Sequence, residues 1–102
     1  MDTATVTLQT GVEVAPNLVA EITQNLASLL KKDPRGRSLI CNLVMRCKDP
    51  THPIFREDED KLKDLSLLQR DGSVCDPAKE IILASVEGKG DETKLVPPVL
   101  IS

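Results

Sequence analysis

Four side chains could bind a metal ion or act as a nucleophile: Cys41, Cys47, His52 and Cys75. Structural zinc sites use close cysteine pairs of the C-x2-C or C-x4-C type. Cys41 and Cys47 are six residues apart, and on a helix they would point in different directions. A zinc site would therefore need Cys75 to fold back onto them. We expect three ordinary free thiols, with no metal and no cofactor.

Catalysis by a cysteine needs a neighbouring base, and His52 is the only histidine of the chain. It is flanked by Pro50 and Pro53, which predicts a surface loop. Gly88-Lys89-Gly90 follows a predicted helix, whereas a phosphate-binding loop precedes one. The acids at 57–60 lack the alternating spacing of a calcium loop. We therefore expect no enzyme activity.

The composition indicates one small soluble domain. A chain of 102 residues has room for one modest core, and the core must be aliphatic because Phe55 is the only aromatic residue. No apolar run approaches the roughly 20 residues that span a bilayer. The odd number of cysteines and the lack of a secretory signal favour a reducing, cytoplasmic compartment.

Charge is distributed unevenly. Segment 31–48 carries six basic residues and one acid, and residues 57–60 are all acidic. We interpret both as solvated faces, with phosphate or nucleic-acid binding by segment 31–48 as an alternative. The net charge of −3 gives no reason to expect a polyanionic partner, so nucleic acid is an unfavoured one.

Apolar spacing and helix-boundary residues predict a mainly α domain. Pro16, Asp33-Pro34 and Asp76-Pro77 suit helix starts, and Gly88 suits a left-handed helix end. Helices are expected at 17–32, at 35 or 38 to 47, at 57–69 and at 77–87. The single domain, 1–102, then consists of an extended or hairpin arm (1–15), a helical core (16–88) and a linker with an apolar tail (89–102).

The tail contains five aliphatic residues around Pro97-Pro98. The two prolines exclude a central strand. We expect it to dock in extended form on the helices, because five exposed aliphatic side chains would favour aggregation. The alternative is an exposed partner-binding segment. Its candidate contact residues are Leu95, Val96, Val99 and Leu100.

The run Leu67–Gly90 resembles a known module. The residues that carry the resemblance are Asp71-Gly72-Ser73-Val74 and Ile81-Ile82-Leu83-Ala84-Ser85-Val86-Glu87-Gly88, followed by Leu95-Val96 and Pro98. That module, of uncharacterised role, occurs in effector proteins that intracellular bacteria of the Legionella type inject into host cells. The resemblance covers about a third of the chain. It implies action in the host cytosol and no particular activity.

Residues 49–57, Asp-Pro-Thr-His-Pro-Ile-Phe-Arg-Glu, are similar to the loop after the central helix of U-box ubiquitin ligases. In that family this loop and an earlier apolar loop together bind a ubiquitin-conjugating enzyme, which implies contacts through Pro53, Ile54 and Arg56. A U-box also needs a hairpin with its own loop before the helix, and residues 1–38 predict a helix there instead.

The sequence therefore predicts a non-enzymatic protein-interaction module with an unknown protein partner. A U-box-like ligase is the first alternative and nucleic-acid binding is the second. The expected contact residues are those of the tail together with Pro53, Ile54, Phe55 and Arg56.

Overall fold

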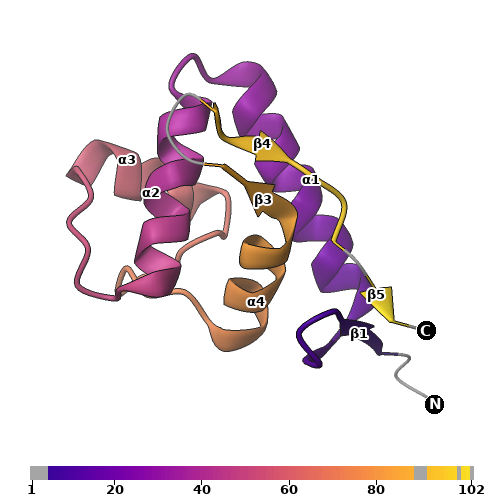
Figure 1. Cartoon of the computed structure of the whole chain (residues 1–102). Helices are drawn as coiled ribbons and strands as arrows, with labels where there is room; N and C mark the ends of the chain where they lie inside the picture. Colours follow the sequence, from indigo (N-terminus) through magenta and orange to yellow (C-terminus); the bar gives the residue numbers. More distant parts are fainter. Residues whose placement is uncertain (1–4, 89–91, 99, 102) are drawn as a thin grey trace.

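The predicted aliphatic stripes form the buried faces of four α-helices in a computed structural model that describes residues 5–88, 92–98 and 100–101 (Figure 1). The expected mainly α class with an N-terminal hairpin is confirmed. The elements in order are β1 (Val6–Leu8), β2 (Glu13–Val14), α1 (Pro16–Lys32), α2 (Gly36–Lys48), α3 (Arg56–Asp64), α4 (Asp76–Ser85), β3 (Val86–Glu87), β4 (Lys94–Leu95) and β5 (Leu100–Ile101).

Helix α1 begins at Pro16, where the missing N–H costs no helical hydrogen bond. Its inward face follows helical spacing, and it ends where the Asp33 N–H reaches the Leu29 carbonyl. Helix α2 starts close against this end, and only a glycine fits at its first position. A Cβ atom on Gly36 would collide with the carbonyl oxygen of Leu29. Asp33 accepts the Arg35 N–H at 2.9 Å, but the cap position of α2 itself is Arg35.

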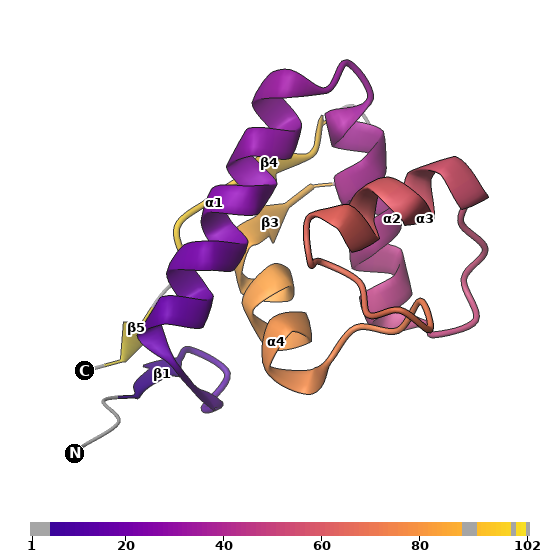
Figure 2. The ribbon, with the colours of Figure 1, turned by 180° about the vertical axis from the view of Figure 1, so that it is seen from behind.

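Helix α4 supplies the centre of the core. Ala78, Ile81 and Ile82 are buried, and α4 packs against both α1 and α2. Figure 2 shows α4 between these two longer helices. The core is one continuous aliphatic cluster, and the Cα radius of gyration is 13.2 Å.

Both ends of the described chain join small antiparallel sheets. Strand β1 lies between β2 and β5, with Leu8 opposite Leu100, and β3 pairs with β4, with Val86 opposite Leu95. Residues 96–98, which follow β4 and include Pro97-Pro98, have no strand geometry. The tail therefore docks through its main chain, and the N- and C-terminal segments lie side by side (Figure 1).

The predicted helix at 57–69 is wrong in its second half. Helix α3 ends at Asp64, and Ser66 adopts a left-handed φ of 61°. The Leu67 N–H then returns to the Leu62 carbonyl at 2.9 Å. Leu67 and Leu68 are buried as expected, but on a turn rather than on a helix.

The predicted helix at 77–87 is also too long. Helix α4 ends at Ser85, and Val86 and Glu87 are extended because they pair with Lys94 and Leu95. Gly88 has a positive φ of 83°, but it follows β3 instead of capping a helix. At the other end the cap position is Cys75, without a side-chain hydrogen bond, so Asp76 does not cap α4. The helical core predicted for 16–88 thus finishes in a strand.

Candidate functional site

The link between α2 and α3, residues 49–55, is called the proline loop below. Its first half is a tight turn, in which the Asp49 carboxylate accepts the Thr51 hydroxyl at 2.6 Å and the Thr51 N–H at 3.0 Å. These two bonds hold the pKa of Asp49 below its ordinary value. The His52 N–H also bonds the Asp49 carbonyl at 3.0 Å, so the turn is fixed at three points.

Arg46 clamps the second half of the proline loop. Its Nε donates to the His52 carbonyl at 2.9 Å, and its Nη1 donates to the Gly72 carbonyl at 2.7 Å. Its Nη2 lies 3.6 Å from a carboxylate oxygen of Glu59 in α3. Only 11% of the Arg46 side chain is exposed, so these contacts are shielded from water and strong.

The turn that receives Arg46 is the Asp71-Gly72 turn predicted from the sequence. The Gln69 N–H reaches the Ser73 carbonyl at 2.8 Å, and the Gly72 N–H reaches the Gln69 carbonyl at 2.9 Å. The Asp71 carboxylate accepts the Ser73 hydroxyl at 2.6 Å, which lowers the pKa of Asp71. Arg46 thus ties the proline loop to an already rigid turn.

This clamp leaves Phe55 at the surface. The only aromatic side chain of the protein is 75% exposed. Pro53 and Arg56 are also exposed, while Ile54 is half-buried against the core. Asn42, Pro53, Ile54 and Phe55 line a hollow of about 310 Å³. The first set of predicted contact residues therefore forms one accessible corner.

The second predicted set is divided. Leu95 and Val96 are half-buried, and the Val96 N–H donates to the Ser85 carbonyl at 2.9 Å. Leu100 belongs to β5 and pairs with Leu8, whereas Val99 lies outside the described residues. This part of the tail belongs to the fold more than to a free surface.

The cysteines and His52 form no common site. Cys47 is buried in the core, and burial raises the pKa of its thiol to about 12. Cys41 and Cys75 are half-buried. Within residues 5–88, 92–98 and 100–101, no three His, Cys, Asp or Glu side chains come together as a metal-binding group.

Ion pairs join the basic segment 31–48 to α3. Arg35 pairs with Asp58 at 3.1 Å, and Lys61 pairs with Asp33 at 3.0 Å. Asp58 is only 1% exposed, so the interpretation of both segments as fully solvated faces is wrong for Asp58 and Arg46. The sequence did contain a signal, because Arg46 lies seven residues after the buried Leu39, on the inward side of α2.

Comparison with known proteins found no matching family model, no matching curated protein and no matching solved structure. None of the helices in the described part of the chain is both long and apolar enough to cross a bilayer.

Proposed function

We propose that this chain is a non-enzymatic protein-interaction module and that the proline loop is its binding surface. The exposure of Phe55 carries the proposal. Burying a phenylalanine side chain contributes about 1.5–3 kcal/mol to folding, and this aliphatic core contains no aromatic residue at all. A fold that leaves its one aromatic ring in water makes it available to a partner, and aromatic residues are enriched at protein interfaces.

The rigidity of the proline loop supports the same proposal. Two prolines limit its backbone, Asp49 fixes its turn, and Arg46 holds its His52 carbonyl. A loop that is ordered before binding loses less conformational entropy when it binds. Arg56 is exposed directly after Phe55. The complementary surface is therefore an apolar pocket for Phe55 with a carboxylate near its edge for Arg56.

A ubiquitin-conjugating enzyme is the alternative partner, as the U-box resemblance implies. The observation in its favour is that Pro53 and Arg56 are exposed and Ile54 borders the hollow next to Phe55. The resemblance to injected bacterial effectors would place either partner in a host cytosol. The case for nucleic acid is weakened, because two of the six basic side chains of segment 31–48, Arg35 and Arg46, are engaged by Asp58 and Glu59 within the fold.

The test begins with a photo-cross-linking amino acid at position 55, and with the same group at the exposed Gln24 of α1 as a control. A partner captured only from position 55 is then purified, and its affinity is measured for the wild type and for two variants. Phe55→Ala should weaken binding by about 30-fold or more, as expected for an interface anchor. Met45→Ala, which truncates the other exposed large apolar side chain, should change it less than threefold.

Identical cross-linked products from positions 55 and 24, or equal affinities for wild type and Phe55→Ala, would overturn the proposal. The alternative is tested by incubating the chain with ubiquitin, its activating enzyme and a panel of conjugating enzymes. Ubiquitin chains that are lost in Ile54→Ala would replace the non-enzymatic proposal with the ligase.

A further inference from the structure

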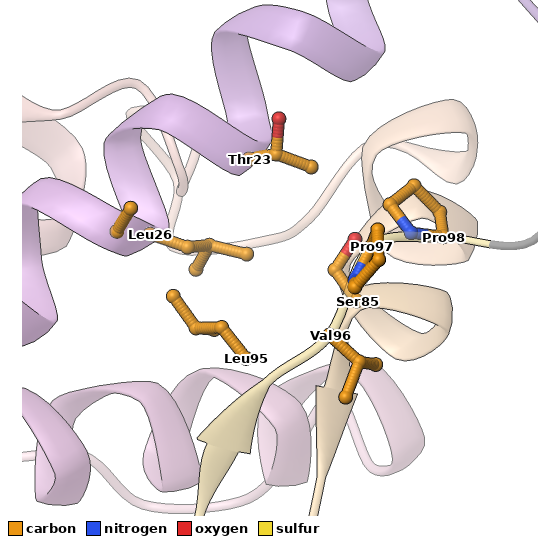
Figure 3. Close-up of a pocket in the computed structure, with 8 residues that line it drawn as sticks. Thr23, Leu26, Ser85, Leu95, Val96, Pro97 and Pro98 are labelled. Atoms are coloured by element: carbon orange, nitrogen blue, oxygen red, sulfur yellow. The ribbon is translucent and has the colours of Figure 1, made fainter.

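The C-terminal tail forms one wall of a second site, far along the sequence from the proline loop. Thr23, Leu26 and Ala27 of α1, Ser85 of α4 and the segment 95–98 line a pocket of about 250 Å³, called the tail pocket (Figure 3). Its walls are mostly aliphatic, and none of the described residues that line it is charged. We propose that the tail pocket binds a small neutral aliphatic molecule that carries one hydroxyl or carbonyl group.

Ser85 is the observation that points to a ligand. The residue is 1% exposed, and its Oγ has no hydrogen-bond partner in the described part of the chain. Helical serines commonly bond a carbonyl in the preceding turn, or else point into solvent. In Figure 3 the Ser85 oxygen lies on the side of the residue that faces α1, the opposite wall of the tail pocket. A buried hydroxyl without a partner costs free energy, and a ligand in this pocket would offset that cost.

The size and lining of the tail pocket define the ligand class. An apolar cavity of about 150 Å³ holds benzene, so 250 Å³ suits a molecule of about six to ten non-hydrogen atoms. A charged ligand would lose its hydration without gaining a counter-charge. Thr23 already donates its hydroxyl to the Val19 carbonyl at 2.8 Å, so Ser85 is left to bind the polar group.

The tail also provides a way in. The Val96 N–H anchors it to the Ser85 carbonyl, and β3–β4 pairing holds Leu95. Beyond Val96, Pro97 and Pro98 have no N–H groups, so this part of the wall donates no backbone hydrogen bonds to its neighbours. Access to the Ser85 hydroxyl through this part of the wall would leave the β3–β4 pairing of Leu95 intact.

The experiment is a titration of the full chain with cyclohexanol and with methylcyclohexane, followed by amide chemical shifts. Cyclohexanol should produce saturable shifts at Ala27, Ser85 and Val96. Methylcyclohexane has a similar shape but no hydroxyl, so its binding should not depend on the Ser85 hydroxyl. Ser85→Ala should weaken cyclohexanol binding about fivefold, the usual effect of one lost hydrogen bond, and leave methylcyclohexane binding unchanged.

Thr93→Val provides the matched control. Thr93 is 3% exposed and has a second unpartnered hydroxyl, but it does not line the tail pocket. Both variants should be at least as stable as the wild type, because each removes an unpaired buried group. Only Ser85→Ala should affect cyclohexanol. Absence of saturable shifts at the pocket, or equal cyclohexanol affinity in wild type and Ser85→Ala, would overturn the proposal.

Discussion

The proline loop and the tail each contain two prolines and some large apolar side chains, yet the fold places these side chains in opposite ways. Phe55 at the end of the loop is 75% exposed, whereas Leu95 and Val96 of the tail are half-buried against the helices. The tail is held by its own main chain, through β3–β4 and β1–β5 pairing. The loop is held by a side chain from elsewhere, Arg46.

This difference shows how a backbone can be fixed while its side chains stay available. Strand pairing brings the tail against α1 and α4, so its aliphatic groups become part of the pocket wall. Arg46 instead donates to a carbonyl oxygen of the loop, and this hydrogen bond does not require Phe55 to be buried. A polar clamp can therefore order a loop without burying its largest apolar side chain.

The largest effect should come from comparing an apolar residue under the tail with the apolar residue of the loop. Leu26 is fully buried, so Leu26→Ala should lower the free energy of unfolding by about 3 kcal/mol. Phe55→Ala removes a larger side chain but should change it by less than about 0.5 kcal/mol. Urea unfolding followed by circular dichroism measures both. Similar losses would mean that Phe55 is packed rather than presented.

Arg46→Met should have the next largest effect, because it leaves the His52 and Gly72 carbonyls without their donor. We expect a loss of about 2 kcal/mol, with faster amide exchange in the proline loop and little change in the tail. Lys48→Met, which removes an exposed charge from the same helix, is the control and should cost less than about 0.5 kcal/mol. Equal exchange in the loop of both variants would argue against the clamp.

A smaller effect is expected at α3, which carries the far end of the loop. Arg35→Met leaves the Asp58 carboxylate buried without its counter-charge and should cost about 1–2 kcal/mol. Lys61→Met breaks a pair in which the Lys61 side chain is half-exposed, and it should cost less than about 1 kcal/mol. Thermal unfolding of the two variants gives the order. The reverse order would mean that the Arg35–Asp58 pair contributes little to anchoring α3.

The smallest expected difference between the proline loop and the tail is in how acid lowers their stability. Hydrogen bonds from Thr51, Lys63 and Ser73 hold the pKa values of Asp49, Glu59 and Asp71 below their ordinary values. Their contribution to stability is therefore complete above the unfolded-state pKa values, and it is lost as pH falls from about 4.5 through the lower folded-state values.

Segment 95–98 carries no carboxylate. Amide protection measured between pH 5 and 2.5 should therefore fall first around the proline loop and later in the tail. Asp49→Asn removes one of the titrating carboxyl groups, so it should reduce the early loss of amide protection around the proline loop. Simultaneous loss of protection in both regions would contradict the role of these carboxylates.

Local sequence patterns predicted the helices where the cause of structure was local. Pro16 and the aliphatic spacing that follows it placed α1 to within one residue. The end of α4 depended on a distant part of the chain, since Val86 is extended only because Leu95 pairs with it. No local sequence pattern contains that pairing, so α4 was predicted to extend two residues beyond its actual end at Ser85.

The candidate site was predicted in the same uneven way. Two prolines around His52 correctly indicated a surface loop, and Phe55 fell within it. The role of Arg46 could not be read from its neighbours, because its partners are carbonyl groups 6 and 26 residues away. Its position on the inward face of α2 was the one available sign that it would be buried.

The central claim is that the fold presents Phe55 for binding, and affinity and stability measured together on Phe55→Ala test it most directly. Titration calorimetry with the purified partner, identified by cross-linking from position 55, gives the affinity of Phe55→Ala and of the wild type. Urea unfolding of the same protein preparations gives the stability. We predict an affinity loss of about 30-fold or more, with the free energy of unfolding unchanged within about 0.5 kcal/mol. Unchanged affinity, or an affinity loss that occurs only with a matching loss of stability, would contradict the claim.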